Sequence, residues 1–375
     1  MRQVVMGLLA AICLPARVRI SGTGSRRLLQ NRRARADRGY YNGWAPDTGD
    51  KVTYSIAERS IGCFKGLAMG DAIGKQTEML SREDLLRWYP QGITGFEGAP
   101  GDIIPRYKGN SKREWRIGET TDDTERTLAV ARAIIRDREV CHASIGREML
   151  NCTKCVHPGV KSFWEFHQAG DPKRTAQNHD GCGAAVRVAP VGIFHGSNSF
   201  ECLVSGAREA SISTHGGSLA VAAAAATAAA VSAALDGALP DQVFEFAERA
   251  AERAENRWAG AKGPVFGKTM RAVHDELASL ADMRAADVAA RCFPNGPLTI
   301  VPLALGLATL MRSAEDAILL AANVGGDSDS VASIAGGILG AMNPNTLNRQ
   351  WHDTVERVNN HALEAVAQEL AALRH

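Results

Sequence analysis

The 375-residue sequence lacks several features that would assign it to a specialised class of protein. Its formal net charge is only +2, which excludes a strongly basic nucleic-acid binder as a description of the whole chain. Its eight cysteines are too few, at this length, for a disulfide scaffold. The sequence also shows no repeat and no sustained alternation of apolar and polar residues of the kind found in strands. What remains is an ordinary globular composition, with 45% hydrophobic residues.

No segment is predicted to span a membrane. The apolar run at residues 4–14 is too short, because a span needs about 20 such residues. The run has the size of a signal-peptide core, and the arginine-rich stretch that follows it is similar to an organelle transit peptide. Residues 1–40 carry a net charge of +8 and the remainder carries −6. We predict a disordered basic arm over residues 1–50 of a cytoplasmic, monomeric protein; a targeting segment or a misplaced start codon are the alternatives.

One cysteine-containing segment has the spacing of a zinc site. Cys152 and Cys155 form a C-x-x-C pair with His157 beside it, and Cys141 precedes them. A structural zinc site usually brings a second ligand pair at a defined distance, which this segment does not clearly supply. We therefore favour reduced thiols that act as small hydrophobic side chains.

Apolar residues at helical spacing predict one all-α domain over residues 51–375. A helix is expected from residue 53 onward, interrupted by the Gly70–Gly74 motif, and a long surface loop is expected over residues 88–118. The alanine-rich run at 217–235 is too weakly hydrophobic for a membrane span and is predicted to be a packed helix. Further helices are expected over residues 124–138, 243–259, 268–281, 300–311, 314–324, 331–341 and 352–373.

Two short acidic motifs each precede a predicted helix. They are Thr120-Thr121-Asp122-Asp123-Thr124 and Gly325-Gly326-Asp327-Ser328-Asp329-Ser330. Helix capping accounts for one or two such residues, but adjacent carboxylates repel one another unless a cation neutralises them. Carboxylate and hydroxyl oxygens are the ligands that hard divalent ions prefer. The two motifs together therefore predict a pair of Mg²⁺ or Mn²⁺ ions.

Three weaker features accompany these motifs. The Gly70–Gly74 motif is followed by Glu78, a further acid beside a glycine-rich segment. The segment from Asp180 to Arg187 is a glycine loop whose backbone N–H groups could hold a phosphate, although such loops are more often simple turns. His215 lies at the start of the alanine-rich helix, where a capping or packing role is the alternative to ligand binding.

The motifs occur in the order seen in ADP-ribosylglycohydrolases, and the sequence resembles that family from about residue 55 to residue 351. The resemblance implies a single multihelical orthogonal bundle with a dinuclear Mg²⁺ or Mn²⁺ centre. By position, it implies the metal ligands Thr121, Asp122, Asp123, Asp327, Asp329 and Ser330. It implies phosphate contacts from Gly181, Gly183 and Ala184, and a ribose contact from His215. The candidate catalytic carboxylates are Glu78, Asp122 and Asp180.

The resemblance also implies the reaction. We expect metal-dependent hydrolysis of the glycosidic bond between ADP-ribose and an acceptor, with protein ADP-ribosyl-arginine or a related linkage as the first choice. The partner is an ADP-ribosylated protein or a small-molecule conjugate, and nucleic acid is not expected. Cys182, where asparagine is common in the family, leaves the substrate preference open. The alternatives are a non-catalytic ADP-ribose-binding relative or an all-α diphosphate-handling enzyme of the terpenoid-synthase kind.

Overall fold

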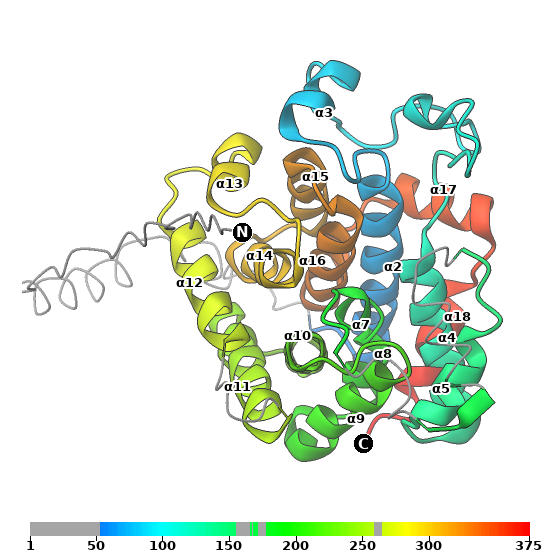
Figure 1. Cartoon of the computed structure of the whole chain (residues 1–375), viewed down its shortest axis with the longest axis vertical. Helices are drawn as coiled ribbons and strands as arrows, with labels where there is room; N and C mark the ends of the chain where they lie inside the picture. The colour runs from blue at the N-terminus through cyan, green and yellow to red at the C-terminus, as the bar shows by residue number, and fades with distance from the viewer. Residues whose placement is uncertain (1–52, 155–165, 167, 172–177, 259–264) are drawn as a thin grey trace, which may run out of the picture. The chain divides into compact units, whose positions relative to one another are not determined.

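The computed structural model describes residues 53–154, 166, 168–171, 178–258 and 265–375, and this part of the chain is helical without a strand (Figure 1). The prediction of an all-α fold is confirmed. The predicted arm at residues 1–50, as well as Cys155 and His157, lie outside the described residues. The elements below all belong to one compact unit, Tyr54–His375.

The order of the elements follows the chain from α2 to α18. The elements are α2 (Ile56–Gly74), α3 (Arg82–Trp88), η1 (Pro105–Tyr107), α4 (Asp122–Asp137), α5 (His142–Met149), α7 (Gly183–Val186), α8 (Ala189–Phe194), η3 (Ser197–Ser199), α9 (Phe200–Ile212), α10 (Ser218–Leu235), α11 (Pro240–Trp258), α12 (Phe266–Ala278), α13 (Ala285–Arg291), α14 (Pro297–Leu310), α15 (Ala314–Val324), α16 (Ser328–Met342), η5 (Pro344–Thr346), α17 (Arg349–Asn359) and α18 (Leu363–Ala371).

Helices α2 and α16 lie side by side at the centre of the bundle and make its most extensive helix–helix contact (Figure 1). Four glycines spaced four residues apart on α2 form the contact face, since this spacing places them on one side of a helix: Gly62, Gly66, Gly70 and Gly74. A Cβ atom on Gly70 would lie only 2.1 Å from the carbonyl oxygen of Ala332 in α16. The backbones approach this closely because these four positions of α2 carry no side chain.

This packing corrects one prediction. The Gly70–Gly74 motif does not interrupt the first helix; it forms the last turn of α2. Its glycines serve the approach of α16 rather than a bend, since residues 56–74 are helical throughout.

Helix α10 passes through the interior of the bundle between α9, α11 and α16. Of the part of the chain that the structure describes, it is the one helix with the length and apolar composition to cross a membrane, which corrects our view of this run as weakly hydrophobic. However, 89% of it is buried inside the protein, as expected for the core helix of a globular domain.

The last predicted helix is two helices. Residues 352–373 were expected to form one segment, but α17 ends at Asn359 and α18 begins at Leu363. Asn360 and Ala362 between them have φ of 54° and 55°, in the left-handed region. The carboxylate of Glu356 accepts hydrogen bonds from the backbone N–H groups of Ala362 (3.1 Å) and Leu363 (2.9 Å) and so holds the break.

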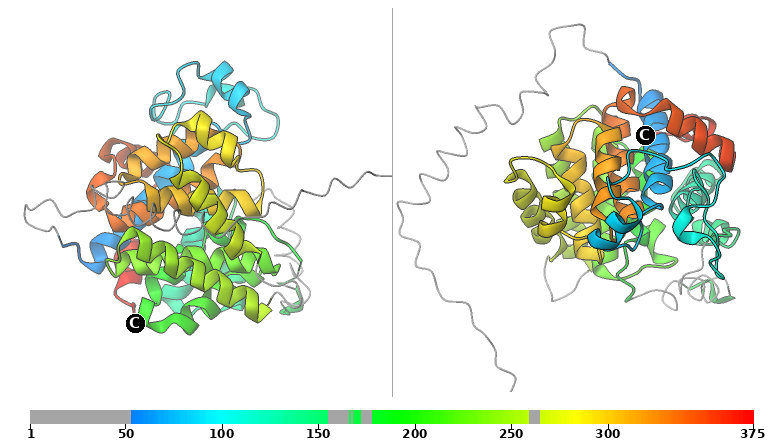
Figure 2. Two further views of the ribbon diagram at one scale, coloured as in Figure 1. Left: turned by 90° about the vertical axis from the view of Figure 1, so that its left-hand side faces the viewer. Right: turned by 90° about the horizontal axis from the view of Figure 1, so that it is seen from above.

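The segment between α2 and α4 projects from one end of the helical body (Figure 2). As predicted, residues 89–118 are mostly irregular, but they contain the short helix η1 and a small hydrophobic core of their own, made of Ile104, Trp115 and Ile117. Arg106 binds this segment to the chain just after α2, because its guanidinium donates to the carbonyl oxygens of Gln76 (2.9 Å) and Glu78 (2.7 Å). The segment therefore has a fixed position beside the end of α2.

Candidate active site

The first acidic motif opens helix α4. Thr121 is the N-cap, and its hydroxyl accepts a hydrogen bond from the backbone N–H of Asp123 (3.1 Å). The fully buried carboxylate of Asp71, on α2, accepts from the backbone N–H groups of Thr121 (2.9 Å) and Thr124 (3.1 Å). The motif is thus attached to the last turn of α2 by Asp71, a positioning residue that our sequence reasoning included in the Gly70–Gly74 motif without giving it a role.

The second acidic motif opens helix α16. Gly325 and Gly326 have φ of 86° and 66°, so the chain makes the tight bend expected of these glycines. Backbone hydrogen bonds fix the bend, from Gly326 N–H to the carbonyl of Leu80 (2.8 Å) and from Asp327 N–H to the carbonyl of Pro294 (2.8 Å). Asp327 is the N-cap, and Asp329 and Ser330 lie in the first turn, each with only 4% of its surface exposed.

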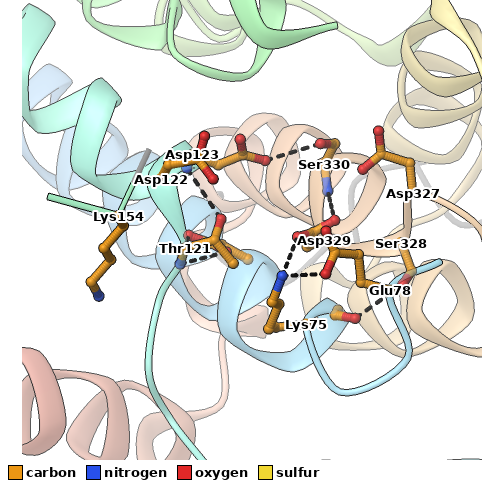
Figure 3. A network of polar contacts seen from close by, with 12 residues as sticks. Lys75, Glu78, Thr121, Asp122, Asp123, Lys154, Asp327, Ser328, Asp329 and Ser330 are labelled. Atoms are coloured by element: carbon orange, nitrogen blue, oxygen red, sulfur yellow. Dashed lines mark hydrogen bonds and ion pairs between the residues drawn. The ribbon is translucent and has the colours of Figure 1, made fainter. Parts of the chain in front are cut away.

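The two motifs meet face to face (Figure 3). The Ser330 hydroxyl donates a hydrogen bond to the carboxylate of Asp123 across the interface (3.0 Å). The thiol of Cys182 donates to the carboxylate of Asp327 (3.4 Å), so the residue that replaces a common asparagine still contacts the acidic motif. The fold therefore brings together two residues that lie 207 positions apart in the sequence, as expected for a shared site.

The motifs form one wall of a cavity of about 770 Å³. Most of the predicted site residues line it, namely Glu78, Asp122, Asp123, Gly181, Gly183, His215, Asp327, Asp329 and Ser330. Thr121 and Ala184 are not among the lining residues and are buried, with 2% and 0% of their surface exposed. Five carboxylates and three cationic side chains face the cavity, the latter being Lys75, Arg126 and Lys154.

The buried carboxylates repel one another. Burial, and after it the neighbouring carboxylates, raise the pKa of Asp123 well above the usual value for aspartate. Burial and Glu78 raise the pKa of Asp329 in the same way, while Lys75 opposes them. Buried anions at such close range require cations beside them to stay ionised. The wall therefore has the electrostatic character of a cation site.

Two protein cations already neutralise part of this charge. Arg126 forms an ion pair with Asp122, four residues earlier on α4 (2.9 Å). Lys75 forms an ion pair with Glu78, and its ammonium lies 4.0 Å from Asp329. Burial lowers the pKa of Lys75, but the carboxylates of Asp329 and Glu78 raise it by more, so the side chain stays charged. Our sequence reasoning missed both cations, because nothing in the local sequence distinguishes them from surface charges.

The carboxylates do not form a finished metal site in this conformation. Within the residues that the structure describes, no three His, Cys, Asp or Glu side chains are grouped as metal ligands. Of the cysteine-containing segment with zinc-site spacing, only Cys141 and Cys152 are described, and no such group of ligands is found around them in the described part of the chain.

The glycine loop contacts the far side of the cavity. The ring of His215 packs on it, 2.9 Å from the position of a Cβ atom on Gly183, so a larger residue would not fit there. Arg187 is fully buried and donates to the carbonyl oxygens of Gly183 (3.0 Å) and Ala210 (2.8 Å). Arg187 therefore holds the loop in place from behind and does not reach the cavity.

Asp180 lies away from the acidic wall. Its carboxylate accepts hydrogen bonds from the backbone N–H groups of Leu219 (3.0 Å) and Ala220 (3.2 Å), at the start of α10. Asp180 does not line the cavity. The structure thus gives this predicted catalytic residue a capping contact, and its catalytic role stays a prediction without support from the geometry.

The fold is shared with a solved structure described as an ADP-ribosylglycohydrolase-related protein complex. The TM-score is 0.63 at 23% sequence identity, and the match covers 86% of this chain and 99% of the other. The model of the ADP-ribosylglycohydrolase family matches residues 53–375. The chain therefore belongs to the ADP-ribosylglycohydrolase family and is a glycosidase-type hydrolase, which confirms the resemblance seen in its motifs.

Three relatives share between 24% and 29% of the aligned residues with this chain. An uncharacterized protein of Archaeoglobus fulgidus is 29% identical over 76% of this chain and 88% of its own length. The uncharacterized protein YegU of Escherichia coli is 27% identical over 76% of this chain and 87% of its own length. The ADP-ribosyl-[dinitrogen reductase] glycohydrolase of Rhodospirillum rubrum is 24% identical over 37% of this chain and 45% of its own length.

Proposed function

We propose that the protein hydrolyses the glycosidic bond between ADP-ribose and a modified acceptor, with release of ADP-ribose, in a reaction that depends on Mg²⁺ or Mn²⁺. The observation that carries this proposal is the contact between Asp123 and Ser330, which joins the two acidic motifs in the wall of a single cavity. A purely structural relative would not need to bury mutually repelling carboxylates at a cavity wall.

The donor set supports divalent ions. Carboxylate and hydroxyl oxygens converge from two helix N-termini, and two of the carboxylates are buried with raised pKa values. The residues that would hold the ions are Thr121, Asp122, Asp123, Asp327, Asp329 and Ser330. Bound there, such ions would orient the ribose hydroxyls and make water more acidic.

The side chains suited to proton transfer are Glu78 and Asp122. Both line the cavity, and each keeps part of its side-chain surface exposed, 23% and 30% respectively. Hydrolysis breaks the bond between the anomeric carbon and the acceptor atom and forms a bond from that carbon to the oxygen of water. One of these two carboxylates accepts a proton from this water. The other, in its protonated form, donates a proton to the leaving group.

The acidic wall also supports ADP-ribosyl-arginine as the linkage that is hydrolysed. An arginine acceptor brings a guanidinium group into a cavity where carboxylates outnumber cationic side chains. The diphosphate would lie toward His215 and the glycine loop, away from most of these carboxylates.

Alanine substitution of one acid from each motif tests the reaction. Asp122→Ala and Asp327→Ala should each lower the release of ADP-ribose by about 100-fold or more. Removing a residue that only supports a metal ligand costs about 10- to 100-fold in activity, and removing the ligand itself should cost at least as much. Release would be measured from site-defined ADP-ribosylated arginine and serine peptides with Mg²⁺ or Mn²⁺. Asp353→Ala, an exposed acid on α17, is the matched control and should keep wild-type activity.

Two results would contradict the proposal. Wild-type release in either acidic variant, or in EDTA, would rule out the metal-dependent mechanism. Binding of ADP-ribose without any turnover by the wild-type protein would instead favour a non-catalytic relative.

A further inference from the structure

Lys75 occupies an unusual position for a lysine. It is the C-cap that follows α2, it lines the cavity, and only 7% of its side chain is exposed. Its ammonium group forms an ion pair with Glu78 and lies 4.0 Å from Asp329, so it stands between the end of α2 and the second acidic motif (Figure 3). A buried ammonium group is costly unless carboxylates and aromatic rings surround it.

Aromatic rings complete its surroundings. The ammonium lies 4.3 Å from the ring centroid of Trp115 and 5.7 Å from that of Tyr107. Both rings come from the segment between α3 and α4, which Arg106 attaches to the backbone at Gln76 and Glu78. The Lys75 ammonium is therefore enclosed on several sides, which limits the rotamers that its side chain can adopt.

This confinement acts on Glu78. One carboxylate oxygen, Oε2, accepts hydrogen bonds from the Lys75 ammonium and from the Tyr107 hydroxyl (3.1 Å). For the other oxygen, Oε1, the described part of the chain shows no hydrogen-bond donor, and Glu78 lines the cavity. An exposed glutamate would sample several rotamers, whereas this one is held by one oxygen with the second left available.

We propose that Lys75 is a positioning residue of the hydrolase: it fixes Glu78 so that Oε1 is presented to the bound substrate. The proposal rests on the proposed function for the identity of the substrate. A lysine that merely neutralised buried charge would not need to contact the same oxygen of Glu78 as Tyr107 does. Catalytic groups held in place by such contacts lose rate when the contact is removed, because small misplacements are costly.

The test compares Lys75→Met with Lys75→Arg. Methionine keeps much of the apolar stem against Trp115 but removes the charge, whereas arginine keeps the charge. We expect Lys75→Met to lower kcat by about 100-fold with little change in KM, and Lys75→Arg to recover part of the loss. Lys65→Met is the matched control, since it breaks an ion pair between Lys65 on α2 and Glu364 on α18, away from the cavity. It should keep wild-type kcat.

A double-mutant cycle with Glu78→Gln separates positioning from a general effect on the fold. If Lys75 acts through Glu78, adding Lys75→Met to Glu78→Gln should lower kcat no further than Glu78→Gln alone. Wild-type kcat in Lys75→Met, or a full multiplicative loss in the double variant, would overturn the proposal.

A crystal structure of Lys75→Met gives a readout that does not need turnover. We expect the Glu78 carboxylate to leave its place beside the Tyr107 hydroxyl. An unmoved carboxylate would overturn the inference about Lys75 whether or not the protein releases ADP-ribose. A wild-type protein that releases no ADP-ribose would instead contradict the proposed function and leave this structural test intact.

Discussion

The two acidic motifs are held to the same turn of α2 by different means. On one side, Gly70 lets the backbone of α16 come into direct contact, because it has no side chain of its own. On the other side, the next residue, Asp71, receives backbone hydrogen bonds from the first turn of α4. Neighbouring residues on a helix point about 100° apart, so one turn serves both motifs.

This difference separates a steric attachment from a polar one. Helix α16 can approach α2 this closely because Gly70 has no Cβ atom, so even one added methyl group should disrupt the contact. The α4 contact depends on the hydrogen bonds that the Asp71 carboxylate accepts. A substitution that keeps part of this accepting capacity should weaken the contact without abolishing it. The distance between the two acidic motifs is therefore set by α2, and the following substitutions should affect it to different degrees.

The largest effect is expected for Gly70→Ala. Alanine favours helices over glycine by about 1 kcal/mol, so an uncrowded site would be stabilised. Here the new methyl group would lie 2.1 Å from the Ala332 carbonyl oxygen, and we expect a loss of roughly 3 kcal/mol in the free energy of unfolding. Equilibrium unfolding in urea measures this free energy of unfolding. Gly296→Ala is the control, since no atom of the described residues, apart from its chain neighbours, lies within 4 Å of its Cβ position. Equal stability of the two variants would contradict the steric attachment.

A smaller effect is expected for Asp71→Asn. An amide cannot accept from all the donors that surround this carboxylate, so we expect a loss of about 2 kcal/mol in the free energy of unfolding. Activity of the folded protein should fall about tenfold, because α4 carries Asp122 and Asp123.

Glu255→Gln is the matched control for Asp71→Asn. The buried carboxylate of Glu255 likewise accepts from backbone N–H groups at a helix start, those of Phe266 (2.7 Å) and Gly267 (3.2 Å) on α12. This variant should lose similar stability but keep its activity per folded molecule. If both variants lose activity alike, the effect of Asp71 is on general stability and not on the site.

The helices were predictable where the signals are local. Residues 314–324 were predicted with the bounds of α15, where the Ser313 side chain caps the start and Gly325 follows the end. The break between α17 and α18 was not predictable, because no proline or glycine marks it and Glu356 stabilises it from a full turn away. The glycines of α2 looked like a turn because their partner, α16, lies more than 250 residues further along the chain.

The candidate site divides in the same way. The meeting of the two acidic motifs could be inferred, because adjacent carboxylates in both motifs call for a shared cation. The direction of the Asp180 side chain could not, since its partners at Leu219 and Ala220 are set by the docking of α10. The positioning role of Lys75 depends on its contacts with both Trp115 and Glu78. It could not be predicted, because no spacing in the sequence connects the three residues.

The smallest effect is expected for Tyr107→Phe, which acts on neither attachment. It removes the hydrogen bond to Glu78 Oε2, together with the one that the hydroxyl accepts from Arg106, and leaves the Lys75 ammonium in place. One such bond contributes about 1 kcal/mol, so kcat should fall about fivefold with the unfolding midpoint nearly unchanged. Tyr89→Phe is the matched control, because within the described residues the Tyr89 hydroxyl makes a single, long contact (3.5 Å), to the carbonyl of Gln76. A loss in Tyr107→Phe as large as that in Asp71→Asn would mean that the segment around η1 positions the site as firmly as α2 does.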